Sequence, residues 1–343
     1  MSILFHKLHN LDPDFYTEER VATLLATIER IKILKDERNA VVLAHNYQRP
    51  EIFEVADFTG DSLGLSLKAA EVKDADVIVF CGVHFMTETA KIVNPEKTIL
   101  LPNLAAGCSL ADMATGPDVA ARAKELRKTY PDLQIVTYVN TTAEVKAQSD
   151  ACCTSSNAVS VVRAMNSDHI LFIPDQNLAR HVALHVPEKT IIAWEGYCYV
   201  HHQITPETVL NMRRQIPGIK ILVHPECRDD VLALADAALS TSGMVDYAQK
   251  SSSANFLAVT ECGLSDLLQL NVPDKNFYRA CKICRFMKAI SLDDVEQALL
   301  LNQFEIEVDE PVRSKARHAL NRMFELTGET RDNLALPDSV APE

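Results

Sequence analysis

Three short apolar runs along the chain end in polar residues. The runs are rich in valine, isoleucine and leucine, and they cover 41–47 (VVLAHNY), 135–140 (IVTYVN) and 221–226 (ILVHPE). A continuous run of this kind, followed by a polar segment, is typical of a buried strand in a parallel sheet. We therefore predict three strands that open into loops near His45, Tyr138 and His224.

The features that follow each run recur in the same order. Ser62, Ser155 and Thr241 stand 17 positions after His45, Tyr138 and His224, and each lies in a cluster of small polar residues. Such clusters before helical stretches are typical of helix N-caps. A second apolar run comes next, at 77–81, 169–173 and 256–259. Cys108, Cys198 and Cys284 complete the pattern, 63, 60 and 60 positions after the same reference residues.

Repetition of these landmarks predicts an α/β protein built from three copies of one unit in a pseudo-threefold arrangement. Each unit is expected to be a small parallel sheet covered by helices. Ligands of such sheets bind beyond the carboxyl ends of the strands, where the aligned polar residues fall. One unit alone would suggest N-caps and architecture only, whereas three in register predict a shared central site.

The predicted domain boundaries follow the repeat. The first unit, with an N-terminal helix over 18–35, is expected in 1–115, the second in 116–205 and the third in 206–291. Residues 292–343 are expected to contain helices that pack back on the first domain, with a frayed end beyond Gly328.

Composition and charge narrow the classes of function. The 343 residues are 47% hydrophobic and 24% charged, as in an ordinary globular protein. The net charge of −13 argues against nucleic acid or an anionic membrane as a main partner. No apolar run reaches the length of a membrane helix, and residues 1–20 lack the apolar core of a signal peptide. We expect a cytoplasmic protein.

The three cysteines in register are candidates for metal ligands. Nine cysteines in a reducing compartment are not expected to form a disulfide framework. Three converging thiolates can hold zinc, with histidine or water as the fourth ligand, or a 4Fe–4S cluster. The chain has one CxxC pair, Cys281 and Cys284, where zinc ribbons usually have two. A cluster on three cysteines leaves one iron open as a Lewis acid, and we favour it over zinc.

The choice within the CxxC pair rests on spacing. Cys281 lies one helical turn before Cys284, so it can replace Cys284 as a ligand or pair with it oxidatively. The 60-residue spacing selects Cys284.

Other polar residues suggest what the site binds. His45 and His224 are candidate acid–base groups or anion anchors, and Tyr47 and Tyr138 can pass protons. Asn140 and Glu226 stand two residues beyond the strand-end positions. Hydroxyl residues at helix N-termini favour carboxylates and phosphates. The predicted ligand is small and polar, with several anionic groups.

Taken together, these segments resemble the quinolinate synthase family over nearly the whole chain. The segments that carry the resemblance are 45–48 (HNYQ), 60–63 (GDSL), 106–112 (AGCSLAD), 137–140 (TYVN), 153–155 (CTS), 194–201 (WEGYCYVH), 224–226 (HPE), 240–243 (STSG) and 284–288 (CRFMK). Glu195 stands where many relatives have proline, and the CxxCxxC run of some relatives is reduced here to Cys281 and Cys284.

The resemblance implies three three-layer α/β/α domains around a central active site, with a 4Fe–4S cluster on Cys108, Cys198 and Cys284. It implies condensation of iminosuccinate with dihydroxyacetone phosphate to quinolinate, phosphate and water in NAD biosynthesis. A link to the enzyme that supplies iminosuccinate follows from this reaction. The implied substrate-binding residues are His45, Ser62, Tyr138, Asn140, Ser155, His224, Glu226 and Thr241. Glu226 and a neighbouring His or Tyr, from among His45, Tyr47, Tyr138 and His224, are expected to move protons.

Two other functions use the same cysteines. A redox sensor or cluster carrier would need the three ligands but not the repeated His, Tyr, Ser and Thr positions. Another iron–sulfur dehydratase would need both, and substrate trials separate it from quinolinate synthesis.

Overall fold

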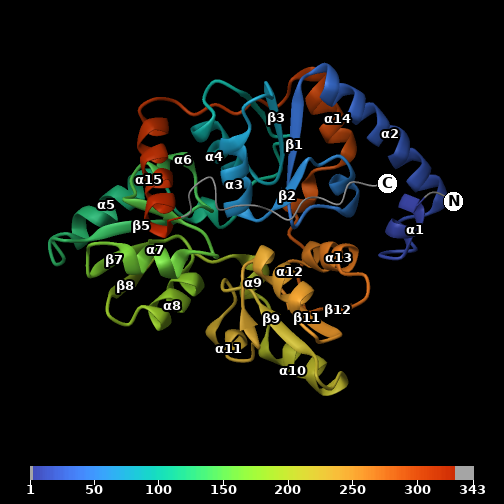
Figure 1. The fold of residues 1–343 in the computed structure, drawn as a ribbon. Coiled ribbons are helices and arrows are strands. Elements are labelled where there is room, and N and C mark those ends of the chain that lie inside the picture. Colours follow the sequence, from blue (N-terminus) through green and yellow to red (C-terminus); the bar gives the residue numbers. More distant parts are fainter. Residues whose placement is uncertain (1–2, 329–343) are drawn as a thin grey trace.

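A computed structural model of the chain describes residues 3–328. Within this range the chain forms three separate parallel sheets of four strands, and each has the strand order second–first–third–fourth (Figure 1). The first sheet contains β1 (Ala40–His45), β2 (Phe58–Gly60), β3 (Val77–Cys81) and β4 (Thr98–Leu100). The second contains β5 (Gln134–Tyr138), β6 (Ala151–Cys153), β7 (His169–Ile173) and β8 (Thr190–Ala193). The third contains β9 (Lys220–Val223), β10 (Ala237–Ala238), β11 (Asn255–Val259) and β12 (Asn276–Arg279). The predicted α/β class with three homologous units is confirmed.

The apolar runs in the sequence correspond to the two central strands of each sheet. The first runs form β1, β5 and β9, and the second runs form β3, β7 and β11. β1 and β5 end at His45 and Tyr138, and β9 ends one residue before His224, so the polar residues stand at the carboxyl ends as expected. The outer strands have two to four residues and no alternating pattern, and the sequence did not indicate them individually.

Helices cover both faces of the first sheet. On one face lie α2 (Glu18–Glu37) and α14 (Leu292–Leu301), whose Ile31 and Leu299 are fully buried against Val42 and Val79. On the other face lie α3 (Ser62–Glu71) and α4 (His84–Val93), which pack against Leu43. The short α1 (Ile3–His9) and the 3-10 turn η1 (Pro50–Glu54) extend the outer layer.

The other two sheets have the same three layers. In the second unit, α7 (Ala158–Ala164) and α8 (Gln176–His185) cover one face, and α5 (Gly116–Leu126) and α6 (Ala143–Lys146) cover the other. In the third unit, α12 (Thr241–Lys250) and α13 (Cys262–Asn271) lie on the inner face, and α10 (Pro206–Gln215) and α11 (Asp229–Leu232) on the outer one. The predicted domain boundaries, after Thr115, Thr205 and Ser291, fall at the N-caps of α5, α10 and α14.

The last two helices pack on different units. α14 packs on α2 and β3 of the first unit. α15 (Val312–Thr327) instead lies mainly on β6, α6 and α7 of the second unit, with a smaller contact to α4, as Figure 1 shows on the left of the view. The prediction that both helices return to the first domain is therefore wrong for α15. Its Leu320 and Met323 join the apolar core that contains Cys152 of β6. The predicted frayed end beyond Gly328 lies outside the described residues.

The inner faces of the units share two apolar cores. Leu63 and Leu67 of α3 pack with the second unit, while Leu65 and Ala69 on the same helix pack with the third. A helix that contributes to two cores holds the sheets with their carboxyl ends facing a common centre. Short connecting elements near this centre are η2 (Ala111–Met113), α9 (Tyr199–His202) and η3 (Met287–Ala289).

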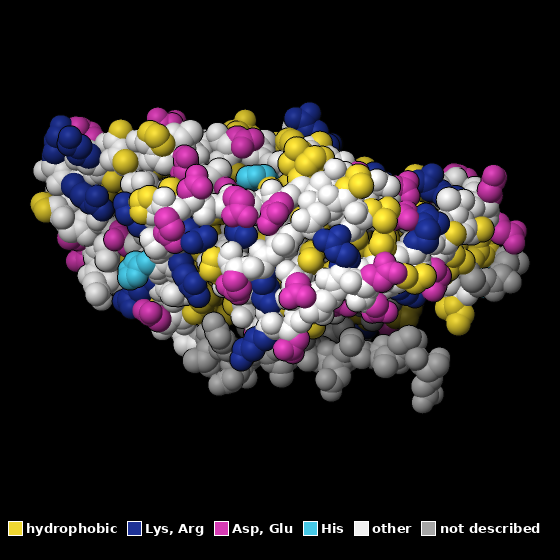
Figure 2. All heavy atoms as spheres, turned by 90° about the horizontal axis from the view of Figure 1, so that it is seen from above, with side chains coloured by type: hydrophobic (Ala, Val, Ile, Leu, Met, Phe, Trp, Pro, Cys, Tyr) yellow, Lys and Arg dark blue, Asp and Glu magenta, His cyan; other side chains and the backbone are white. Residues whose placement is uncertain are grey.

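None of the helices in the described part of the chain is long and apolar enough to cross a lipid bilayer. Among the described residues on the face seen in Figure 2, acidic side chains are interspersed with basic ones.

Candidate active site

One cavity lies where the three units meet, and every residue that the sequence singled out for the site lines it. These residues are His45, Tyr47, Ser62, Cys108, Tyr138, Asn140, Ser155, Cys198, His224, Glu226, Thr241 and Cys284. They come from all three units and from segments up to about 240 positions apart in the sequence. Further lining residues are Asp61, His201 and Glu261 on the polar side, with Phe85, Met86 and Met287 among the apolar ones.

The two strand-end histidines have the same hydrogen-bonding arrangement. The backbone N–H of Tyr47 donates to Nδ1 of His45 over 3.1 Å, and that of Glu226 donates to Nδ1 of His224 over 3.3 Å. An Nδ1 atom that accepts a hydrogen bond leaves the proton of the neutral ring on Nε2. Each ring is therefore held by the backbone N–H of the residue two positions later in its own loop. The Nε2–H group of each ring is left as a donor for a ligand.

Burial determines the charge of these rings. It lowers the pKa of His45 to about 4 and that of His224 to about 3; neighbouring positive groups reinforce the shift, and nearby carboxylates oppose it. The sequence suggested acid–base groups near neutral pH, but both rings are neutral there. They can donate hydrogen bonds to an anionic ligand without carrying a charge.

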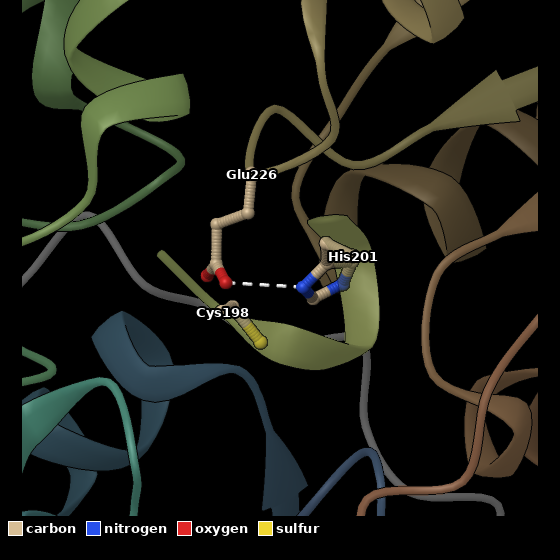
Figure 3. A group of neighbouring side chains, drawn as sticks. All are labelled: Cys198, His201 and Glu226. Atoms are coloured by element: carbon tan, nitrogen blue, oxygen red, sulfur yellow. Dashed lines mark hydrogen bonds and ion pairs between the residues drawn. The ribbon is translucent and has the colours of Figure 1, made fainter. Parts of the chain in front are cut away.

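Glu226 of the third unit binds two side chains of the second unit. Its Oε1 accepts a hydrogen bond from the Tyr138 hydroxyl over 2.6 Å, and its Oε2 lies 3.0 Å from Nδ1 of His201 (Figure 3). Burial alone raises the pKa of Glu226, but His201, His224 and the Tyr138 hydrogen bond outweigh it and lower the pKa to about 2. Glu226 is thus an ionised carboxylate in a buried site, held by its donors.

The other nitrogen of His201 is connected through Thr260 to Tyr47 of the first unit. Nε2 of His201 lies 2.9 Å from Oγ1 of Thr260, and the same Oγ1 lies 2.5 Å from the Tyr47 hydroxyl. The pKa of Tyr47 is raised by burial and by the charge of Glu226. Glu226, His201, Thr260 and Tyr47 therefore form one continuous chain of hydrogen-bonding groups through which a proton can pass.

The three candidate ligand cysteines are free and partly buried, and each begins a short turn at the cavity wall. Cys198 is the N-cap of α9, Cys108 lies before η2, and Cys284 lies before η3. Burial raises the pKa of all three thiols, that of Cys108 to about 12, although backbone N–H groups of the following turn oppose the shift. A bound metal that favours thiolate would compensate for this burial.

Cys198 also belongs to a second possible metal-binding group. One ligand atom each from Cys198, His201 and Glu226 lies within 4.8 Å of the others, and Figure 3 shows the thiol beside the Glu226–His201 pair. Both nitrogens of His201 already have partners, Glu226 and Thr260. Metal binding by this trio would break that chain of hydrogen bonds, whereas binding by the three cysteines leaves it intact.

Cys281 has a different partner from the one expected. It forms a disulfide with Cys262 at the start of α13, with the Cα atoms 5.1 Å apart. The pairing of Cys281 with Cys284, which the sequence left open, is not observed, and one disulfide is present where no disulfide framework was expected. The segment before Cys284 runs alongside the start of α13, where Glu261 pairs with Lys282, and this brings Cys281 to Cys262.

Hydroxyl groups from all three units also line the cavity. Ser62 and Thr241 are the first residues of α3 and α12, and Ser155 lies shortly before α7. Oδ2 of Asp61 accepts hydrogen bonds from Ser156 over 3.1 Å and from Ser240 over 3.2 Å, so this carboxylate joins all three units. The Oδ1 atom of Asn140 is buried without a hydrogen-bond partner among the described residues, and the side chain lines the cavity. An acceptor in this position is suited to a donor on a bound ligand.

Sequence reasoning missed several polar residues of the site. Thr260 and Glu261 directly follow β11, and Asp175 occupies the position of Glu261 in the second unit. The signal was present for the two carboxylates, because Asp175 and Glu261 each stand two residues after the end of β7 and of β11. To find these residues from the sequence, the segments after the strands must be aligned between the units as well as the strands themselves.

Comparison with known proteins gives a consistent picture. The family model described as "Quinolinate synthetase A protein" matches residues 29–325. The chain is 51% identical over 302 residues to the quinolinate synthase of Thermodesulfovibrio yellowstonii. The alignment covers 88% of this chain and 98% of the relative. It is 50% identical over 301 residues to that of Alkaliphilus metalliredigens (87% and 98%) and 48% identical over 300 residues to that of Agrobacterium fabrum (87% and 85%).

Proposed function

The chain belongs to the quinolinate synthase family, and we propose that its central cavity condenses iminosuccinate with dihydroxyacetone phosphate to quinolinate, phosphate and water. This reaction serves the de novo synthesis of NAD, and an enzyme that produces iminosuccinate supplies the first substrate. The observation that carries the proposal is the meeting of three free cysteines, the Glu226–His201 pair and hydroxyl residues from all three units in one cavity.

The residues present fit a 4Fe–4S cluster. Cys108, Cys198 and Cys284 would hold it, since their thiols are free, come from three units and line one cavity. Ligation by three cysteines leaves one iron available as a Lewis acid for substrate oxygen or nitrogen. Cys152 and Cys153, which are also free, are fully buried in the core of the second unit and do not line the cavity.

Substrate anions would bind at the hydroxyl residues that line the cavity. Ser62 and Thr241 begin helices of ten residues each, where backbone N–H groups and the helix dipole favour carboxylate and phosphate. Ser155 adds a hydroxyl from the second unit, and neutral His45 and His224 add Nε2–H donors. The unpartnered Oδ1 of Asn140 suits a hydroxyl or imine N–H of the substrate.

Ring formation requires several proton transfers, and the buried chain of hydrogen bonds can carry them. Ionised Glu226 accepts a proton at Oε1 or Oε2, where Tyr138 and His201 already lie. His201 passes a proton between Nδ1 and Nε2, and Thr260 connects Nε2 to the Tyr47 hydroxyl. Tyr47 and Tyr138 then exchange protons with substrate oxygen atoms on their side of the cavity.

The test is quinolinate formation by anaerobically purified protein given iminosuccinate and dihydroxyacetone phosphate. We expect product from protein that contains iron and sulfide, and none after their removal. Absence of product from protein with a full cluster would favour another iron–sulfur dehydratase. Zinc in place of iron, measured by elemental analysis of the same sample, would contradict the proposed cofactor.

A further inference from the structure

Two of the three cysteine segments rest on a buried carboxylate that the proposed mechanism does not use. Asp175 in the second unit and Glu261 in the third occupy the same position, two residues after the end of β7 and of β11. Both are N-caps, of α8 and α13, and their exposures are 0% and 1%. Burial of a carboxylate costs free energy unless its oxygens are well hydrogen-bonded, so these positions need an explanation.

Each carboxylate divides its two oxygens between two tasks. Oδ1 of Asp175 accepts hydrogen bonds from the backbone N–H groups of Asn177 and Leu178 and so caps α8. Its Oδ2 accepts the backbone N–H of Cys198 over 3.0 Å.

Glu261 repeats this division in the third unit. Its Oε2 accepts the N–H of Gly263 over 2.6 Å at the start of α13, and its Oε1 accepts the N–H of Cys284 over 3.0 Å. The same kind of bond therefore reaches the backbone of a candidate ligand cysteine in two units.

Helix capping alone does not explain a carboxylate here. In the first unit the same position is Val83, and α4 begins there without any side-chain cap. A neutral residue with one acceptor suffices for a cap, as Thr115 shows at the start of α5. The second acceptor oxygen is what a carboxylate adds, and in both units that oxygen binds a cysteine N–H.

The backbone around the two carboxylates is built for close approach. The segment before Cys198 pairs with Asp175 at Gly196, where a Cβ atom would collide with the carbonyl oxygen of Pro174. In the third unit, Gly263 leaves space for Lys288, whose Nζ lies 3.5 Å from Oε2 of Glu261 and also donates to the carbonyl oxygen of Tyr47. The segment before each of the two cysteines therefore lies close to its carboxylate, at Gly196 beside Asp175 and at Lys282 beside Glu261.

We propose that Asp175 and Glu261 are positioning residues that fix Cys198 and Cys284 for the metal cluster, and that Cys108 is held without such an anchor. This inference rests on the proposed function of the three cysteines as cluster ligands. A hydrogen bond from the backbone N–H of a ligand residue to a fixed carboxyl oxygen limits how its Sγ can move, so two ligands are in place before the cluster binds. In the first unit, the segment before Cys108 is held by a backbone bond from His84 to Ala106 and by the bonds of Asn103 to Ala289 and Asp294, and no carboxylate of the described residues accepts the N–H of Cys108.

The sharpest variant is D175N. An amide has one acceptor oxygen and one N–H donor group, so its oxygen can keep the cap of α8 while its NH2 group faces the N–H of Cys198. The shape is unchanged and the helix stays capped, but the bond to the cysteine is lost. E261Q makes the same change in the third unit and is an independent second variant.

The matched control is E51Q. Glu51 is also a buried carboxylate, 3% exposed, but it accepts its hydrogen bond from the Tyr16 hydroxyl and does not line the cavity. If loss of a buried charge alone destabilised the protein, E51Q would show the same effect. Circular dichroism and thermal unfolding of all three variants establish that they fold.

The experiment is anaerobic reconstitution with iron and sulfide, followed by the rate of iron loss to bathophenanthroline and by the EPR spectrum of the reduced cluster. We expect iron loss to be about 10- to 100-fold faster in D175N and E261Q, with an altered spectrum, and unchanged in E51Q. Wild-type rates and spectra in both variants would overturn the positioning role and leave the cluster itself in place. A wild-type protein that takes up no iron would overturn both.

Discussion

Nδ1 of His201 lies 3.0 Å from Oε2 of Glu226, and both side chains are almost completely shielded from solvent. Burial of a lone carboxyl group would favour its neutral form, yet the pKa of Glu226 is lowered because His201 and His224 lie beside it. An ionised carboxylate fixed on one nitrogen of a histidine determines which tautomer the ring adopts. The pair therefore fixes whether the other nitrogen of His201, which lies beside Thr260, is a hydrogen-bond donor or an acceptor.

The first prediction concerns Glu226. E226Q keeps the shape of the side chain but removes its charge and one acceptor, so Glu226 can no longer take a proton. We expect the iron content to stay at the wild-type level and the turnover number for quinolinate to fall by about 10²- to 10⁴-fold, the usual range for loss of an acid–base group. Steady-state kinetics with matched iron analysis measures both. Turnover at the wild-type rate would remove Glu226 from the proton-transfer chain.

The second prediction concerns Thr260, which the sequence did not indicate. T260V replaces the hydroxyl that connects His201 and Tyr47 by a methyl group of the same size. An unsatisfied buried partner costs about 1–3 kcal/mol, and on a transition state this corresponds to roughly 10- to 100-fold in kcat. T260S keeps the hydroxyl and is the control. Full activity in T260V, or an equal loss in T260S, which keeps the hydroxyl, would mean that the hydrogen bonds of Thr260 do not account for the effect.

The third prediction is a dependence of stability on pH that comes from His45. Its pKa is about 4 in the folded protein, below the ordinary value of 6.5, because the ring is buried. Between these values the unfolded chain binds a proton that the folded chain does not. The contribution of neutral His45 to stability is therefore complete above about pH 6.5 and is lost as the pH falls towards 4.

Urea denaturation of wild type and H45N at pH 7, 6 and 5 tests this dependence. The free energy of unfolding of wild type should fall relative to that of H45N, by up to about 2 kcal/mol between pH 7 and pH 5. H318N, which removes an exposed histidine, is the control. A constant difference between wild type and H45N over this range would contradict a buried neutral ring.

Much of the candidate site follows from one periodic pattern. The 17-residue spacing from His45 to Ser62 recurs because each unit has the same short connection from its first strand, through an outer strand, to a helix. Residues at equal positions in equal units meet on the central axis, so their convergence on one cavity was predictable without knowledge of the packing. The central strands were predictable for the same reason, since their buried runs stand out from the polar loops.

The features that were missed depend on contacts between segments. The amphipathic pattern of α15 indicates a buried face but not which unit it packs against, and its contacts with β6, α6 and α7 form only in the folded chain. Asp175 and Glu261 look like ordinary surface acids in the sequence, since only the approach of the cysteine segments encloses them. The bond between Cys262 and Cys281 depends on the path of the segment after β12, which no local pattern reports.

The last prediction separates the two cysteines of the CxxC pair. Cys284 is free and lines the cavity, whereas Cys281 is bonded to Cys262 and does not line it. C284S should therefore lose the cluster and cluster-dependent turnover, while C281S should keep both.

C262S frees the thiol of Cys281 and is the more stringent variant, because a free Cys281 three positions before Cys284 could compete as a ligand. The Cys284 backbone stays bonded to Glu261 in that variant, so we expect full iron content there too. Iron and sulfide per chain, with the visible absorbance of anaerobic samples, measure the outcome. The contradicting outcome is full iron in the C284S variant that is lost again in the C281S/C284S double variant. It would show that Cys281 replaces Cys284 as the third ligand. Neither the spacing of the repeat nor the bond to Glu261 would then select the ligand.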